Sequence, residues 1–179
     1  PALTKRGKLS TRAEPGMADE PCVIAPGGGY RGLENRLYRV EIHSGGKTDN
    51  PTFKWSRDNG SVVMRIEKFD AKKVFVKSKG KDQVLALRKN DWVEVLGEET
   101  ELSGKPGTLA RIVDGPNLEQ VIDGKERMFA ITLSKDVSGY KSEGNPKVRR
   151  WDHGEKNSNE LADGAIPIRI GQWLSLIHI

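Results

Sequence analysis

Cysteine is almost missing from this sequence, because Cys22 is the only one in 179 residues. A lone cysteine cannot close an internal disulfide, and no cysteine and histidine cluster with metal-ligand spacing is present. Its neighbours Pro21 and Val23 are typical of a small, buried, apolar cysteine. We therefore expect no structural disulfide, no metal site and no cofactor.

Long apolar runs are missing as well. No stretch approaches the roughly 18–20 residues that a membrane helix requires. Hydrophobic residues make up 35% of the chain and charged residues 31%, so we expect a polar, strongly hydrated surface and no membrane partner. No charged-then-apolar leader is present, although the chain begins at Pro1 rather than methionine, so that absence carries little weight.

The charge is positive but dispersed. The net charge is +5 and the sequence pI is about 9.3, a balance that invites a nucleic-acid interpretation. The basic clusters TKRGKLSTR (4–12), DAKKVFVKSKGK (70–81) and NPKVRRWDH (145–153) are short and interrupted. No RNP-type aromatic motif, helix-turn-helix pattern or zinc-finger spacing accompanies them. We interpret them as solvated surface, with contact to a polyanion as the weaker alternative and a nucleic-acid partner not expected.

Helical periodicity is also missing, since no segment carries a 3.6-residue apolar stripe over three turns. Glycine (20) and proline (9) punctuate short, alternating apolar segments. The predicted fold class is all-β: short antiparallel strands and hairpins forming a β-sheet plus a small SH3-like barrel, with long polar loops. The predicted divisions are an irregular basic lead-in (1–29), a β-hairpin and sheet unit (30–70), a small barrel-like unit (71–135), a loop-rich β segment (136–173) and a non-native ending (174–179), with barrel strands near 74–78, 91–96, 108–114 and 128–133.

The segment TFKWSRDNGSVVMRI (52–66) predicts a hairpin. An Asn59-Gly60 type I′ turn would pair Trp55 with Met64 and Phe53 with Ile66, and would leave one face apolar. The preceding segment alternates Tyr38, Val40 and Ile42 with Arg39, Glu41 and His43, which predicts a half-buried strand.

Catalytic constellations are missing. His43 ends a strand on its polar face, and His153 follows Asp152 directly, where successive strand side chains point to opposite faces. No G-x-S-x-G elbow and no P-loop spacing is present, and the acidic run GEETE (97–101) is typical of a solvated turn. We therefore expect a protein that is not an enzyme.

The tryptophans offer the candidate binding residues. Trp55, Trp92, Trp151 and Trp173 lie on predicted strands, where core packing is the default. The alternative is a stacking platform for sugar rings or bases, which needs exposed rings flanked by polar donors and acceptors. The segments KWSRDNG and RRWDH have that composition, and they supply the candidates Trp55, Arg57, Asp58, Asn59, Arg150, Trp151 and Asp152. Arg149, Arg150 and Asp152 could equally form a charge-assisted structural clasp.

The runs GGGYRGLENRLYRVEIHSGG, PTFKWSRDNGSVV, NDWVEVLGEETELSGKPGTL and RRWDH, taken in order, resemble an uncharacterised bacterial family, domain of unknown function 6519. The resemblance extends from about residue 9 to residue 173. It implies an accessory or structural part of a phage-tail-like contractile injection or baseplate particle, and no catalytic motif. The ending LSLIHI resembles translated adapter sequence.

Two functions follow. The first is a non-enzymatic structural or accessory component of a phage-tail-like apparatus that docks to other proteins of the assembly. It would be assembled in the cytoplasm and released as part of an extracellular particle. The alternative is a carbohydrate-binding or carbohydrate-active surface module whose partner is a cell-surface glycan. Two exposed tryptophans in a groove would favour the glycan, and buried tryptophans would favour docking.

Overall fold

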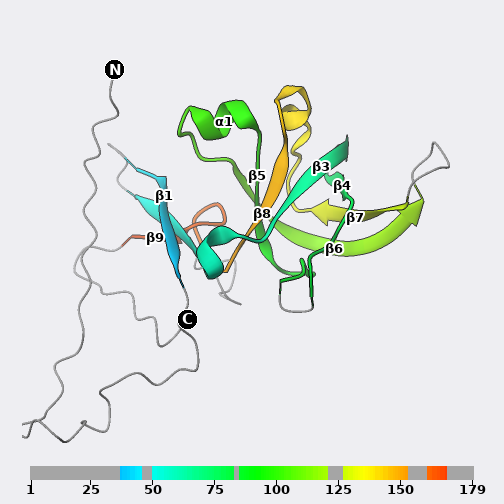
Figure 1. Cartoon of the computed structure of the whole chain (residues 1–179). Helices are drawn as coiled ribbons and strands as arrows, with labels where there is room; N and C mark the ends of the chain where they lie inside the picture. The colour runs from blue at the N-terminus through cyan, green and yellow to red at the C-terminus, as the bar shows by residue number, and fades with distance from the viewer. Residues whose placement is uncertain (1–36, 46–49, 83–84, 121–126, 153–160, 169–179) are drawn as a thin grey trace, which may run out of the picture. The chain divides into compact units, whose positions relative to one another are not determined.

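The computed structural model describes residues 37–45, 50–82, 85–120, 127–152 and 161–168 (Figure 1). These residues all belong to one compact unit, Arg36–Ile179. The expectations for the lead-in 1–29, Cys22, His153, Trp173 and the ending 174–179 lie outside the described residues.

The all-β fold class is confirmed. The strands are β1 (Arg39–Ser44), β2 (Thr52–Ser56), β3 (Val63–Asp70), β4 (Lys73–Val76), β5 (Trp92–Leu96), β6 (Thr108–Gln120), β7 (Arg127–Leu133), β8 (Lys147–Trp151) and β9 (Ile166–Pro167). One short α-helix, α1 (Glu98–Leu102), and two 3-10 turns, Asp58–Gly60 and Ser138–Ser142, complete the described part of the chain. The strands expected near 74–78, 91–96, 108–114 and 128–133 are confirmed as β4 to β7.

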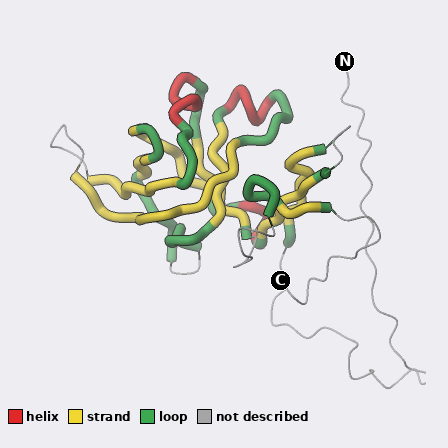
Figure 2. Tube along the Cα trace, turned by 180° about the vertical axis from the view of Figure 1, so that it is seen from behind, coloured by secondary structure: helices red, strands yellow, loops and turns green. Residues whose placement is uncertain are grey.

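The strands form two antiparallel groups (Figures 1 and 2). A small sheet has the order β1-β2-β9, and the other six strands close into a barrel in the order β3-β4-β7-β6-β5-β8. The barrel takes β3 and β8 from outside the range 71–135, because β8 pairs with both β3 and β5 and so completes the ring. Figure 2 shows the long β6–β7 pair extending from it.

The predicted register of residues 52–66 is wrong. Trp55 pairs with Val40 of β1, and Met64 pairs with Val148 of β8. The turn itself is real, since Asp58, Asn59 and Gly60 have φ values of 53°, 57° and 65°, the left-handed region that Asn, Asp and Gly tolerate best. It sends the chain from the small sheet into the barrel instead of folding β3 back onto β2.

Strand β2 is buried along its whole length. Its apolar face belongs to a cluster of Phe53, Trp55, Leu161 and Ile166, with Tyr38 and Trp92 packed against it. Its other face carries Lys54 and Ser56, which are 2% and 1% exposed. A strand in the middle of a small sheet that also contacts a barrel has no solvent side, so its polar residues require buried partners.

Strand β1 is half-buried as expected, but its polar side faces inward. Val40 and Ile42 are 41% and 57% exposed, whereas Glu41 and His43 are half-buried. Glu41 Oε2 lies 3.4 Å from Lys54 Nζ, so the buried ammonium of β2 selects which face of β1 turns inward.

The interior of the barrel is apolar. Its buried residues are Val62, Ile66, Val74, Val76, Leu87, Val93, Val95, Ala110, Ile112, Ile131, Leu133, Val137 and Val148. β-Branched side chains dominate this set, in agreement with strands whose inward positions must fill a narrow closed interior.

Candidate functional site

The two described tryptophans among the predicted binding residues are buried. Trp55 is 5% exposed and Trp151 is 1% exposed. The Arg57 guanidinium carbon lies 6.0 Å from the centroid of the Trp55 ring and covers it further. A stacking platform requires an accessible ring face, so neither ring can serve as one.

Asp152 joins the end of β2 to the end of β8. Its Oδ2 accepts hydrogen bonds from Ser56 Oγ at 2.9 Å and from the backbone N–H of Arg57 at 2.8 Å. Its own backbone N–H donates to the Trp55 carbonyl at 3.0 Å, and its Oδ1 lies 3.4 Å from Arg150 Nε. Four of the seven predicted residues, Trp55, Arg57, Arg150 and Asp152, therefore meet around the Asp152 carboxylate and backbone. Of the clasp that the sequence offered as an alternative, Arg150 and Asp152 are paired, whereas Arg149 Nη2 donates to Glu101 Oε1 at 3.1 Å instead.

The remaining two candidates lie on the turn between the small sheet and the barrel. Asn59 is exposed and Asp58 is half-buried. The backbone N–H of Asn59 donates to the Leu37 carbonyl at 2.9 Å. Gly60 packs so tightly behind them that a Cβ there would lie 3.2 Å from Arg39 Cδ, which ties the turn to β1.

A buried ion pair between the small sheet and the barrel was missed by sequence reasoning. Lys54 of β2 contacts Glu94 of β5, and each side chain is only 3% exposed. Glu94 Oε1 also accepts from the Gly107 backbone N–H at 2.7 Å, and Oε2 accepts from Trp151 Nε1 at 2.9 Å. Lys54 Nζ lies 4.7 Å from the centroid of the Trp151 ring. Every oxygen of this carboxylate is therefore occupied, as a buried charge requires.

One sequence signal could have identified half of this pair. Glu94 lies on the same face of its strand as Trp92 and Leu96. Because these two large apolar side chains favour a buried face, they indicate that the Glu94 carboxylate is buried too. Lys54 stood on a face expected to be polar, and its partner is 40 residues away. No local pattern could connect the two.

His43 and Glu41 lie beside this ion pair. Burial and the Lys54 ammonium lower the pKa of His43 below its usual 6.5, and they outweigh Glu94, which raises it. The His43 Nδ1 atom is buried and has no hydrogen-bond partner among the described residues. Burial raises the pKa of Glu41, but Lys54 and Arg39 together lower it further, so it ends below 4.5.

We expect His43 to make the fold sensitive to acid. Since the folded state lowers the His43 pKa, it favours the neutral ring. The resulting stability is present above the unfolded value of 6.5 and is lost as the pH falls from there through the lower pKa of the folded state. The free energy of unfolding, measured by urea denaturation from about pH 7 to about pH 5, should fall for the wild type and fall less for His43→Gln. Glu41 titrates below this window. Parallel curves for the two proteins would contradict the expectation.

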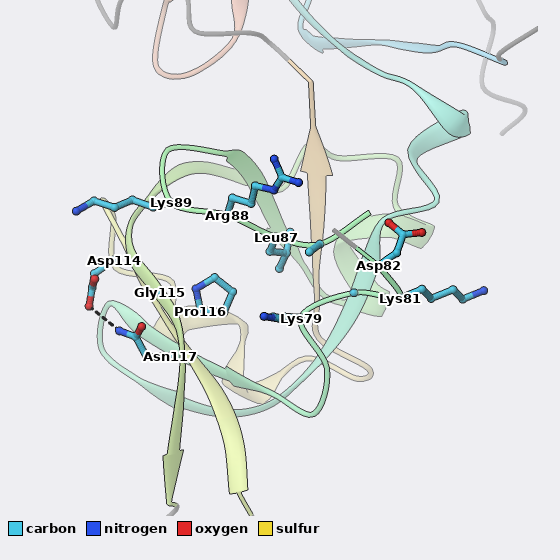
Figure 3. A pocket seen from close by; sticks show the side chains of 12 residues that line it. Lys79, Lys81, Asp82, Leu87, Arg88, Lys89, Asp114, Gly115, Pro116 and Asn117 are labelled. Carbon is cyan, nitrogen blue, oxygen red and sulfur yellow. Dashed lines mark hydrogen bonds between the residues drawn. The ribbon is translucent and has the colours of Figure 1, made fainter. Parts of the chain in front are cut away.

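A second feature is an open hollow of about 760 Å³ on the barrel (Figure 3). It is lined by Lys79, Gly80, Lys81, Asp82, Ala86, Leu87, Arg88, Lys89, Asp114, Gly115, Pro116 and Asn117. Four of these side chains are cations and two are carboxylates, and the hollow is open to solvent.

The described residues contain no group of three or more His, Cys, Asp or Glu side chains arranged to hold a metal ion. No helix in the described part of the chain is long and apolar enough to cross a membrane.

The comparison with protein families gives a match over residues 6–178 to a family of unknown function, DUF6519. The chain belongs to this family. The DUF6519 match continues beyond Trp173, the last residue to which the quoted motifs carried the resemblance. No curated protein and no solved structure matches this DUF6519 chain.

Proposed function

We propose that this chain is a non-enzymatic docking component of a multiprotein assembly. The observation that supports the proposal is the edge strand β1. Among the described residues it pairs only with β2, and it presents Val40 and Ile42 outward at 41% and 57% exposure. Figure 1 shows β1 at the border of the small sheet.

An exposed edge strand with apolar side chains at alternate positions fits an extended partner segment. The backbone groups along its other edge pair with no described strand and can pair with a partner strand, and its alternate side chains can pack against apolar residues at every second position of that strand. Leu37, 66% exposed just before β1, extends the apolar row. The proposed occupant is therefore a β-strand of another protein that carries small or medium apolar residues at alternate positions.

The proposed assembly is of the phage-tail-like, contractile-injection kind, put together in the cytoplasm and released within an extracellular particle. Its support is the setting that the resemblance of the sequence motifs implies; the matched family itself is one of unknown function. The alternative, a carbohydrate-binding surface module, loses its original support, because Trp55 and Trp151 are buried.

The test replaces both outward apolar residues of β1 with lysine. A tagged full-length chain is expressed in its native host, and cell extracts are fractionated by size. We expect the wild type in a high-mass fraction together with sheath or baseplate proteins identified by mass spectrometry. The double variant Val40→Lys/Ile42→Lys should shift to the low-mass fraction, since charge on an edge strand blocks pairing.

The matched control is Val113→Lys/Leu118→Lys, which changes two other exposed apolar residues, 42% and 48% exposed, on β6. It adds the same charge and should leave the wild-type distribution unchanged. A wild-type chain confined to the low-mass fraction would overturn the proposal, and equal shifts of both double variants would show that β1 is not the docking strand. Urea denaturation of each variant checks that it is folded.

A further inference from the structure

The hollow on the barrel is built from two segments that are distant in the sequence. One is the stretch 79–89 between β4 and β5, described except at residues 83–84, and the other is an irregular part of β6 around Gly115. Opposite β7 the register shifts between Ile112 and Asp114 and again between Asp114 and Asn117. This bulge carries Asp114 and Asn117 to the rim of the hollow, as bulges commonly re-aim side chains.

The walls of the hollow are fixed by hydrogen bonds. The Leu87 backbone N–H donates to the Lys79 carbonyl at 2.7 Å, and the Leu85 N–H donates to Asp82 Oδ1 at 2.8 Å. Gly80 has a φ of +135°, and a Cβ there would lie 2.4 Å from the Leu85 carbonyl oxygen. The backbone at residue 80 therefore lies so close to the backbone at Leu85 that only glycine fits at this point. This close approach defines the shape of the hollow before any ligand binds.

The charges around the hollow are mixed but mainly positive. Lys79, Lys81, Arg88 and Lys89 are exposed cations. In Figure 3, Lys81 and Lys89 point outward on opposite sides of the hollow, and Lys79 lies between them. Positive charge at both ends and in the middle suits an elongated ligand that carries repeated negative groups better than it suits a single small anion.

One part of the rim carries no positive charge and presents the hydrogen-bonding side chains of Asp114 and Asn117. Asn117 Nδ2 donates to Asp114 Oδ2 at 3.0 Å, so the two side chains hold each other, and the bond occupies one carboxylate oxygen. A carboxylate accepts hydrogen bonds, and a carboxamide both donates and accepts them. This pair therefore suits hydroxyl groups, and it repels the phosphates of a ligand that offers only negative charge.

We propose that this hollow binds an acidic saccharide, a sugar chain that carries carboxylate or sulfate groups. The lysines neutralise the acidic groups, and Asp114 with Asn117 takes hydroxyl groups between them. None of the described lining residues is aromatic, so the base stacking that supports single-stranded nucleic-acid binding is not available there. The apolar lining residues are Ala86 and Leu87, 6% and 1% exposed, and the half-buried Pro116, so no large exposed apolar side chain of the described lining is available to anchor a peptide. The site is independent of β1 docking.

The experiment measures binding of two probes to the full chain by isothermal titration calorimetry at low ionic strength: an oligogalacturonate of defined length and a sulfated oligosaccharide. The methyl-esterified oligogalacturonate, which keeps its hydroxyls but loses its charge, is the neutral comparison. We expect one or both acidic probes to bind and the neutral one to bind at least about tenfold more weakly. The ratio of the two acidic affinities distinguishes carboxylate from sulfate ligands.

Two double variants remove equal charge in different places. Lys79→Gln/Lys89→Gln should weaken binding of the acidic saccharide about tenfold, the loss of two exposed ion pairs. Lys105→Gln/Lys141→Gln, at exposed lysines outside the hollow, should leave it within about twofold. Equal losses in the two double variants would show attraction by net charge alone and would overturn the proposal.

A third variant separates saccharides from other polyanions. Asp114→Ala/Asn117→Ala should weaken binding of the acidic saccharide, because its hydroxyl partners are lost. The same variant should leave binding of a single-stranded oligonucleotide or of polyglutamate unchanged or stronger, because a carboxylate has been removed.

Tighter binding of the oligonucleotide or of polyglutamate than of both saccharides by the wild type would overturn the proposal in favour of that ligand, and no binding of either acidic saccharide would overturn it outright. The β1 variant Val40→Lys/Ile42→Lys should bind the saccharide normally, so this proposal can fail or succeed separately from docking.

Discussion

Glu94→Gln is expected to lower the free energy of unfolding by about 3 kcal/mol, the lower end of the range for breaking a buried pair, because it removes the buried counter-charge of Lys54 and leaves only the half-buried Glu41, whose Oε2 lies 3.4 Å from Lys54 Nζ. Both side chains are 3% exposed, so water cannot replace the lost partner. Urea denaturation at neutral pH measures the change, and the slope of the transition should stay constant if only stability has changed.

Two further variants test whether the loss of stability comes from the unpaired buried charge. Lys54→Met/Glu94→Leu removes both charges together and should recover most of the lost stability, since a well-packed apolar pair is often as stable as a buried ion pair. Glu119→Gln breaks the Lys73–Glu119 pair, which has a 3.1 Å contact and side chains 35% and 39% exposed. It should cost about 1 kcal/mol or less. If Glu94→Gln costs no more than Glu119→Gln, the ion pair does not join the small sheet to the barrel as described.

Trp151→Ala is expected to cost about 3–5 kcal/mol, the usual range for truncating a buried tryptophan. Trp151 is 1% exposed and packs with Leu109 and Ala165, so the substitution opens a cavity. It also removes the Nε1 donor from Glu94 Oε2. Differential scanning calorimetry or urea denaturation provides the measurement.

Trp151→Phe separates the two losses. It keeps most of the ring volume but removes the indole N–H, so it should cost less than Trp151→Ala and more than a surface substitution. If Trp151 were instead part of an exposed stacking platform, both variants would be almost neutral for stability and would abolish saccharide binding. We expect the opposite: a folded Trp151→Phe protein that binds the acidic saccharide as well as the wild type does.

The sequence predicted the elements better than their partners. Alternation within 108–114 and 128–133 identified strands that form the core of the barrel as β6 and β7. Asn59 and Gly60 indicated a turn, and the turn is there. The hairpin predicted around it failed because turn chemistry fixes the backbone only locally, whereas β2 gains more by pairing with β1 and β9 on both of its edges.

For the candidate site the sequence predicted which residues lie close together but not whether they are buried or exposed. Trp55, Arg57, Arg150 and Asp152 do meet: Asp152 accepts from the Arg57 N–H, donates to the Trp55 carbonyl and lies beside the Arg150 guanidinium. Their composition alone could not separate a binding surface from a clasp, because the same aromatic, guanidinium and carboxylate groups serve both. Burial decided between them.

By itself the sequence determined the all-β class, the positions of the main barrel strands and the turn at Asn59-Gly60, because alternation and turn chemistry act over a few neighbouring residues. Only the tertiary structure decided which strands pair, which face of β1 points inward, that Lys54 meets Glu94, and that residues 79–82, 86–89 and 114–117 line one hollow. Those outcomes depend on contacts between residues tens of positions apart, where burial of a charge or of a ring outweighs any local preference.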